Sequence, residues 1–237
     1  MKKRMTKVTA GRLVSVVVYY QPSSADDPAT RAAKQRASSE ARARINRRYS
    51  WQKLEALLAA NFGSKDLWVT LTYDDDHYPP SRREAVHRMQ NYMRALRAAR
   101  KIEGADLLYI KNTESISESG LPGRLHHHAV INGTGHDYDT IAGLWRWGSA
   151  VEIKPLLDGT HTYGDYARYM AKEAPPLGKN GWTPSRNLKR PTRESWIVDD
   201  ALTIAPPPGA VVLERTEQHN GWGEYVYLKY LLPEYKT

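Results

Sequence analysis

The chain of 237 residues contains no cysteine, which excludes disulfide bonds, thiolate nucleophiles and metal sites with cysteine ligands. No stretch approaches the ~20 consecutive apolar residues of a membrane-spanning helix. The phosphate-binding pattern GxxxxGK[ST] is absent too, so we do not expect a nucleotide-driven helicase. The basic first residues precede the apolar run Leu13–Tyr20, but Ser15 interrupts this run and no small-residue cleavage site follows it. We therefore expect a strand rather than a signal peptide, and a cytoplasmic protein with no membrane partner.

Basic residues are in clear excess. Lys and Arg total 35 against 26 Asp and Glu, which gives a formal net charge of +9. Such an excess suits an anionic partner such as nucleic acid, although it also serves simple solubility. Apolar residues make up 41% of the chain, enough for one sizeable core.

Hydrophobic periodicity predicts alternating strands and helices between Leu67 and Glu173. In chain order we expect a strand, a helix, two strands, a helix, a strand and a helix, at Leu67–Tyr73, Ser81–Arg100, Leu107–Thr113, Leu125–Ile131, Tyr138–Trp147, Ala150–Ile153 and Tyr163–Glu173. Ser81 and Glu84 have the spacing of a helix capping box. The order predicts an α+β fold, in which an antiparallel sheet with a split β-α-β (ferredoxin-like or RRM-like) core carries helices on one face.

Two further segments flank this core. Ala29–Asn61 predicts a helix whose first half is strongly basic, and this half is either a solvated face or an arm that contacts phosphates through Arg44, Arg47 and Arg48. Val211–Arg215 and Tyr225–Leu231 predict a closing β-hairpin. We therefore expect an N-terminal extension over residues 1–62, a core over 63–197, and a C-terminal hairpin over 198–237 that packs on the core.

The octet RLHHHAVI, Arg124 to Ile131, places three histidines inside a predicted strand. Side chains alternate between the faces of a strand, so His126 and His128 share one face, roughly 6.6 Å apart along it. His127 points to the opposite face, which has the composition of a core. The first two could bind one cation, whereas His127 fits a buried histidine satisfied by hydrogen bonds.

Glu114 ends the preceding predicted strand. If the two strands form a hairpin, its carboxylate lies near His126. Two imidazoles and one carboxylate leave coordination positions open on a divalent ion, as a catalytic site requires. A solvated carboxylate at a strand end is the alternative.

The stretch YARYMAKE places Tyr169 and Lys172 one helical turn apart. A tyrosine hydroxyl is a weak nucleophile at neutral pH, but a metal-polarised phosphate and a neighbouring ammonium would compensate. Tyr166, one turn earlier, is a possible second nucleophile. Core packing is the alternative for both tyrosines.

Together these motifs resemble the HUH endonucleases, and specifically the single-domain rolling-circle replication initiators of bacterial plasmids, prophages and integrative elements. Four stretches carry the resemblance, namely LWVTLTYDDD, YIKNTES with GRLHHHAVING, YARYMAKE, and the basic SRNLKRP that follows. The resemblance implies that His126, His128 and Glu114 bind the metal, that Tyr169 is the nucleophile and that Lys172 assists it. Relatives with two tyrosines carry the second one four residues upstream, where this chain has Asp165, which favours a one-tyrosine enzyme.

The resemblance also implies an activity. With Mn²⁺ or Mg²⁺, the enzyme would nick single-stranded DNA or an extruded origin hairpin, form a 5′-phosphotyrosine link and leave a 3′-OH primer. Arg186, Lys189 and Arg190 are expected to contact phosphates, and Trp145, Trp147 and Trp182 either stack on bases or belong to the core. A host helicase and polymerase would be partners. A mobilisation relaxase, a single-strand transposase and a non-catalytic DNA-binding module of the same fold remain alternatives.

Overall fold

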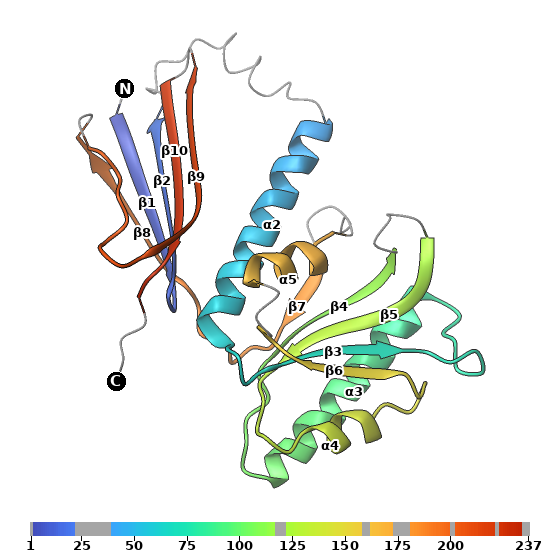
Figure 1. The fold of residues 1–237 in the computed structure, drawn as a ribbon. Coiled ribbons are helices and arrows are strands. Elements are labelled where there is room, and N and C mark those ends of the chain that lie inside the picture. The colour runs from blue at the N-terminus through green and yellow to red at the C-terminus, as the bar shows by residue number, and fades with distance from the viewer. Residues whose placement is uncertain are drawn as a thin grey trace. The chain divides into compact units, whose positions relative to one another are not determined.

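The structure is a computed structural model that describes residues 2–21, 39–116, 122–157, 162–172, 181–199, 202–220 and 223–233. The chain forms two compact units (Figure 1). Unit 1 contains residues 1–49 and 189–237, and unit 2 contains residues 50–188. Helix α2 (Ser39–Asn61) crosses the boundary between them, so its second half belongs to unit 2. No helix in the described ranges has the length and apolar character needed to span a membrane.

Unit 2 is built on a five-stranded antiparallel sheet in the order β6-β3-β5-β4-β7. The strands are β3 (Leu67–Thr72), β4 (Tyr109–Ile116), β5 (Pro122–Ile131), β6 (Val151–Pro155) and β7 (Trp182–Pro184). The helices of this unit are α3 (Arg82–Ile102), α4 (Tyr138–Gly143), α5 (Tyr163–Met170) and the second half of α2. The predicted α+β class with a split β-α-β core is therefore confirmed.

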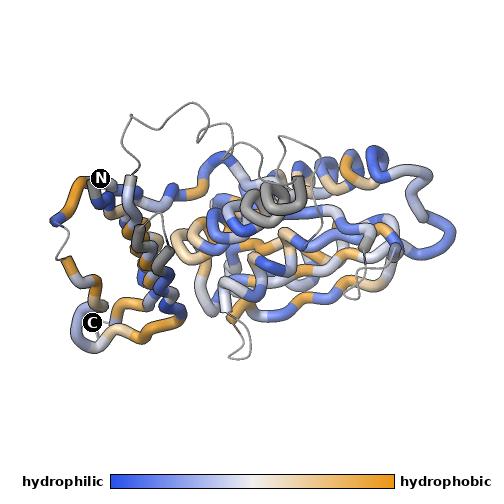
Figure 2. The backbone as a smooth tube through the Cα atoms, turned by 90° about the horizontal axis from the view of Figure 1, so that it is seen from above, coloured by the Kyte–Doolittle hydropathy of each residue, from blue (hydrophilic) through white to orange (hydrophobic). Residues whose placement is uncertain are grey.

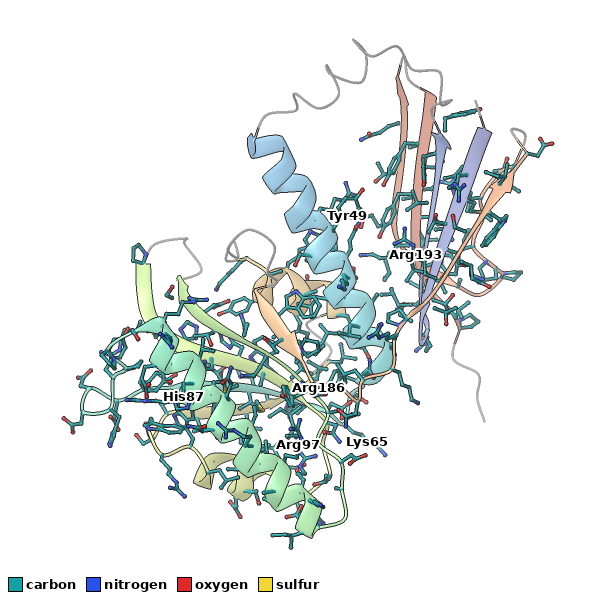
Figure 3. The ribbon with its side chains drawn as sticks, turned by 180° about the vertical axis from the view of Figure 1, so that it is seen from behind. Tyr49, Lys65, His87, Arg97, Arg186 and Arg193 are labelled. Atoms are coloured by element: carbon teal, nitrogen blue, oxygen red, sulfur yellow. The ribbon has the colours of Figure 1, made fainter. Side chains whose placement is uncertain are left out.

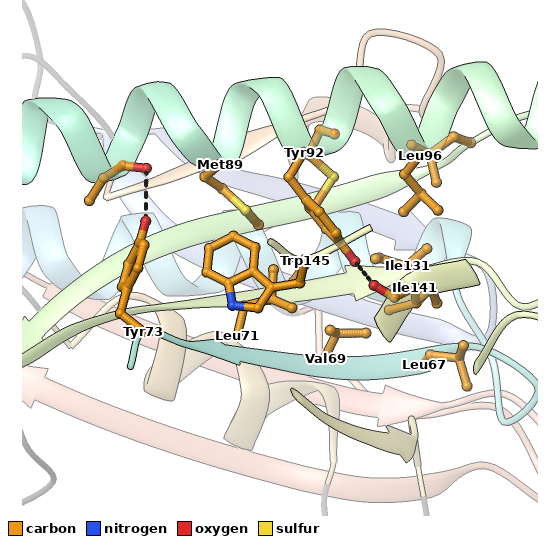
Figure 4. Packing of buried hydrophobic residues seen from close by; sticks show 14 of the residues in the cluster. Leu67, Val69, Leu71, Tyr73, Met89, Tyr92, Leu96, Ile131, Ile141 and Trp145 are labelled. Carbon is orange, nitrogen blue, oxygen red and sulfur yellow. Dashed lines mark hydrogen bonds between the residues drawn. The ribbon is translucent and has the colours of Figure 1, made fainter. Parts of the chain in front are cut away.

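One face of this sheet packs against α3 and α4. Leu67, Val69 and Leu71 alternate along β3 toward this side, and Met89 and Leu96 of α3 pack onto them (Figure 4). A period of two in the strand and of about 3.6 in the helix brings these apolar side chains to a single interface. Blue and orange segments alternate accordingly along the backbone tube in Figure 2.

The opposite face packs against α5 and the second half of α2. Trp68, Ile110 and Val130 contribute from the sheet, and Leu54, Leu58, Ala167 and Met170 from the helices. Gly164 lets the two helices approach, since a Cβ at this position would lie 2.9 Å from Oε1 of Glu55. Helices therefore cover both faces, whereas the sequence led us to expect them on one face and left the last helix crossing the sheet or its edge.

Helix α3 begins as predicted, because the Ser81 side chain accepts a hydrogen bond from the backbone N–H of Glu84. The carboxylate of Glu84 does not complete a capping box here; it accepts a hydrogen bond of 2.9 Å from Nε of Arg88. Near its other end, α3 carries the fully buried Arg100. Its guanidinium lies 2.8 Å from Oδ1 of Asp137 and donates to the carbonyl of Asn132 at 2.7 Å. This pair ties the helix to the loop that precedes α4.

Unit 1 is a second five-stranded antiparallel sheet, in the order β8-β1-β2-β10-β9. Its strands are β1 (Lys2–Ala10), β2 (Leu13–Gln21), β8 (Thr192–Val198), β9 (Val211–Asn220) and β10 (Gly223–Leu231). Gly11, with a φ of 57°, turns β1 into β2. The predicted strand at Leu13–Tyr20 and the closing hairpin are present, and the hairpin is longer than expected.

The sequence did not predict β1, β7 or β8. Strands β1 and β8 are polar and basic, and β7 has only three residues, so neither alternation nor length distinguishes them from loops. Where we expected separate extensions over residues 1–62 and 198–237, residue contacts group the first 49 residues with residues 189–237. The reason is strand pairing between segments far apart in the chain. Residues 29–38 of the expected basic helix lie outside the described residues.

Replacing Arg100 with Met should lower the free energy of unfolding by about 3 kcal/mol, because the buried carboxylate of Asp137 would lose its cation. Urea denaturation at neutral pH measures this loss. The adjacent, exposed Lys101 provides the control, and Lys101→Met should change stability by less than about 0.5 kcal/mol. Similar losses in both variants would contradict the assigned role of the Arg100–Asp137 pair.

Candidate active site

The three histidines divide between the two faces of the sheet as the alternation predicts. His127 faces α3, whereas His126 and His128 face α5. Strand β4 pairs with β5 in a register that sets Glu114 directly opposite His126. The carboxylate of Glu114 is fully buried rather than solvated at a strand end. Strand pairing therefore brings the three expected ligands together.

The geometry of these residues fits a metal ion. Oε2 of Glu114 lies 3.3 Å from Nε2 of His126 and 3.4 Å from Nε2 of His128. One potential ligand atom from each residue lies within 4.8 Å of the others. Two ligand atoms that are each about 2.1 Å from an ion stand about 3.4 Å apart at a tetrahedral angle. The side chains of Glu114, His126 and His128 would thus need little rearrangement to hold an ion.

Neighbouring groups fix the orientation of both imidazoles. Nδ1 of His126 lies 2.8 Å from the carbonyl oxygen of Arg124, which can only accept, so this nitrogen carries the proton. Nδ1 of His128 lies 3.1 Å from the hydroxyl of Thr70. With both Nδ1 atoms engaged, each neutral ring presents the lone pair of Nε2 to the Glu114 carboxylate. Metal-binding histidines are commonly held in this way.

The protonation states also favour a cation at this point. Burial lowers the pKa of His128 below its ordinary value, and Glu114 only partly opposes this. Burial would raise the pKa of Glu114, but contacts with His126, His128 and Lys172 outweigh it and hold the pKa at about 2. A lone pair of His128 therefore faces a carboxylate oxygen, and among the described residues neither atom has a hydrogen-bond partner. Two buried acceptors in contact are unfavourable unless a cation lies between them.

Tyr169 and Lys172 lie beside the cluster. The ring centroid of Tyr169 is 5.0 Å from that of His128, and Nζ of Lys172 is 3.8 Å from the Tyr169 centroid. Helix α5 ends at Met170, but the backbone N–H of Lys172 still donates to the carbonyl of Tyr169 at 3.2 Å. The turn that continues the helix thus brings Nζ of Lys172 to 3.0 Å from Oε2 of Glu114.

Asp165 and Tyr166 have structural contacts. The Asp165 carboxylate accepts hydrogen bonds from the backbone N–H and hydroxyl of Thr162, at 2.8 and 2.7 Å, and completes a capping box at the start of α5. Tyr166 is buried and its ring lies 4.9 Å from that of Trp68. Asp165 therefore begins the helix that presents Tyr169, while Tyr166 contributes to its packing.

Sequence reasoning missed three residues at this site. Asn112 donates from Nδ2 to Oε1 of Glu114 at 3.3 Å and to the carbonyl of Met170 at 3.2 Å, so it links the cluster to the end of α5. Trp68 stacks on His128 with ring centroids 5.0 Å apart. The third is Thr70, which contacts His128. The only signal in the sequence is that Trp68, Thr70 and Asn112 alternate in phase with the face of the metal cluster.

His127 has the environment of a core histidine. It is fully buried, with Nε2 2.7 Å from the hydroxyl of Tyr73 and Nδ1 2.9 Å from the hydroxyl of Thr113. Burial lowers its pKa to about 3, so the ring is neutral at physiological pH. Of the tryptophans considered for base stacking, Trp145 and Trp182 are buried in the core and Trp147 packs against it.

The expected DNA-binding residues lie elsewhere. Arg186, in unit 2, and Lys189 and Arg190, in unit 1, are exposed. Arg48 is also exposed and lies 3.6 Å from the carboxylate of Glu214. The side chains of Arg44 and Arg47 are outside the described part of the chain. The structure therefore does not gather these six residues at the metal cluster.

Comparison with known proteins agrees with the resemblance seen in the sequence. Residues 66–174 match the model of a family described as replication-associated protein ORF2. The matched segment contains the metal cluster and Tyr169, and the match supports a role in DNA replication. Neither the curated proteins nor the solved structures contain a match to the chain.

The affinity for Mn²⁺ should rise with pH across the neutral range. Burial lowers the pKa of His126, but the Glu114 carboxylate and the Arg124 carbonyl raise it above its ordinary value. A bound ion must displace this proton, so binding should release protons below that pKa and fewer above it. Titration calorimetry at several pH values, in buffers of different ionisation enthalpy, measures the release. A pH-independent affinity would contradict His126 as a ligand.

Thr70→Val should weaken Mn²⁺ binding about tenfold, because the substitution keeps the shape of the side chain but removes the hydroxyl that orients His128. Thr72 lies on the same strand face and is opposite His126, so Thr72→Val is the matched control and should bind Mn²⁺ normally. Equal affinity in the two variants would show that Thr70 does not position the ligand.

Proposed function

We propose that the chain is a rolling-circle replication initiator that nicks single-stranded origin DNA through Tyr169. One observation carries the proposal, namely that a tyrosine ring and an ammonium group lie beside a buried cluster of two histidines and a glutamate. Hydrolysis would need only the ion and a water molecule. The adjacent nucleophile favours strand transfer, and the match of residues 66–174 to a replication-associated family supports the same class of reaction.

His126, His128 and Glu114 would hold the metal ion. Nitrogen ligands make Mn²⁺ a better candidate than Mg²⁺, which prefers oxygen ligands. The ion would supply Lewis-acid polarisation of the scissile phosphate. Asn112 and Thr70 hold the carboxylate and His128 in place, so the chain's own contribution is a preorganised set of ligands.

The hydroxyl oxygen of Tyr169 attacks the phosphorus atom of the scissile phosphodiester. A bond forms between this oxygen and phosphorus, and the bond between phosphorus and the 3′-oxygen breaks. The phenol loses its proton and the departing 3′-oxygen gains one, which leaves a 5′-phosphotyrosine link and a 3′-OH. Because the link keeps the phosphodiester energy, attack by a 3′-OH reverses the step and rejoins strands.

Lys172 is placed to assist this step. Burial lowers the pKa of its ammonium group, but Glu114 and Tyr169 outweigh this effect and raise the pKa above its ordinary value. The group therefore stays charged at neutral pH. It can stabilise the phenolate of Tyr169 and the negative charge that develops on the phosphate.

The proposed substrate explains the basic composition. Phosphate contacts are assigned to exposed basic residues, of which Arg186, Lys189, Arg190 and Arg48 are described. The 3′-OH would prime a host polymerase, and a host helicase would separate the strands. Such a protein would act in the cytoplasm, on the replicating DNA of a plasmid or phage.

Tyr169→Phe should abolish the covalent protein–DNA adduct while leaving Mn²⁺ and DNA binding intact, since the change removes a single oxygen. Tyr166→Phe should keep at least partial activity, because this side chain belongs to the core. The assay incubates each variant with Mn²⁺ and single-stranded oligonucleotides that tile the DNA adjoining its own gene, followed by a denaturing gel. EDTA should suppress the adduct of the unsubstituted protein.

The outcomes separate the alternatives. An adduct that survives in Tyr169→Phe but disappears in Tyr166→Phe would move the nucleophile one turn along the helix. Cleavage without any adduct would indicate metal-assisted hydrolysis. Binding without cleavage in the unsubstituted protein would indicate a non-catalytic DNA-binding module. A relaxase or transposase would form the adduct on DNA of a transfer origin or a transposon end.

A further inference from the structure

Strand β4 also carries functional side chains on the face opposite the metal cluster. Asn112 and Glu114 point toward α5, so Tyr109, Lys111 and Thr113 point toward α3. Lys111 pairs across the sheet with Ala129 of β5 and Thr183 of β7, which sets it between two strands. Only 7% of its surface is exposed. A lysine this deeply buried in a sheet is unusual and calls for a specific explanation.

Lys111 lies in a pocket of about 280 Å³ between β4 and α3. Helix α3 lines the pocket with residues spaced by three, four and seven positions, which form one helical face, and β4 supplies two more. The lining residues are Gln90, Met93, Arg94, Arg97, Tyr109 and Lys111. Three of these side chains carry a positive charge and none carries a negative one. Figure 3 views the α3 side of unit 2 and labels Arg97.

The charges in this pocket are poorly compensated. Among the described residues the Lys111 ammonium has neither an ion pair nor a hydrogen bond. Burial lowers its pKa to about 8, because the charged form has lost water without gaining a partner. The guanidinium of Arg97 lies 5.7 Å from the centroid of the Tyr109 ring, and that of Arg94 donates to Asn91. A carboxylate is missing from the lining, so an anion from outside the chain is the natural partner.

We propose that this pocket binds a phosphate group, with Lys111 at its buried end and Arg94 and Arg97 at its rim. Guanidinium and ammonium donors on neighbouring elements are the groups that recognise phosphate oxygens in proteins. The Tyr109 ring and the Met93 side chain provide an apolar wall that a sugar or base attached to the phosphate can contact.

This site is separate from the metal cluster. Successive residues of β4 point to opposite faces, so a phosphate held by Lys111 is on the other side of the sheet from Glu114. It cannot be the scissile phosphate. The phosphate belongs either to a second segment of a bound nucleic-acid strand or to a free mononucleotide, and the experiment distinguishes these two sources.

The test uses the full chain in EDTA, so that its outcome does not depend on the metal or on cleavage. The variants Lys111→Met and Arg97→Gln each remove one charge, and Met suits the buried position of Lys111. Arg83 is an exposed arginine of α3 that does not line the pocket, which makes Arg83→Gln the matched control. The probes are thymidine 5′-monophosphate and a single-stranded oligonucleotide. NMR of backbone amides follows the mononucleotide, and fluorescence anisotropy at several salt concentrations follows the oligonucleotide.

A nucleic-acid source predicts that Lys111→Met and Arg97→Gln each lower the slope of log affinity against log salt by about 0.7, whereas Arg83→Gln leaves the slope unchanged. A free mononucleotide predicts shifts in amides of Gln90–Arg97 and Tyr109–Lys111 that both variants abolish, with oligonucleotide binding unaffected. Either result supports the pocket. If neither probe distinguishes the two variants from Arg83→Gln, the proposal is overturned. Arg97→Gln keeps the test decisive if Lys111→Met does not fold.

Discussion

A single buried oxygen, Oε2 of Glu114, organises the catalytic face of unit 2. His126 and His128 approach it from β5 and Lys172 from the turn after α5, all within 3.4 Å. A carboxylate without exposure to water is costly unless cations or donors surround it. The requirement to compensate this one charge therefore links a strand pair to a helix end, and it sets the side chain of Tyr169 beside the only described cluster of potential metal ligands.

The run of three histidines shows how one strand can serve two purposes. His127 is neutral and hydrogen-bonded between Tyr73 and Thr113, so the α3 face keeps its core. Its two neighbours face a different environment, where a carboxylate shifts their protonation. Adjacent residues of identical type thus differ in chemistry because the strand alternates, and the hydroxyls of Tyr73, Thr113 and Thr70 determine which ring nitrogens are engaged.

Local patterns predicted the features that depend on one strand or one helix. The faces of His126 to His128, the cap at Ser81 and the antiparallel sheet all follow from periodicity. The register that places Glu114 opposite His126 was predictable only approximately, because nine loop residues precede Arg124. Asn112, Thr70 and the pocket at Lys111 were not predictable, since each depends on contacts between elements distant in the chain. The same reason hides the sheet of unit 1, whose polar strands are defined by their pairing.

The strand order of unit 1 has a consequence for biosynthesis. Strands β1 and β2 are made first, but their neighbours β8 and β10 follow only after residues 50–188. Those intervening residues contain every strand of their own sheet, so on the ribosome they can fold while the β1–β2 hairpin still lacks both flanking partners. A hairpin with two open edges pairs readily with other chains. The unit that carries the chemistry can thus be complete before the unit formed by the flanking segments, and the interval between them is when aggregation threatens most.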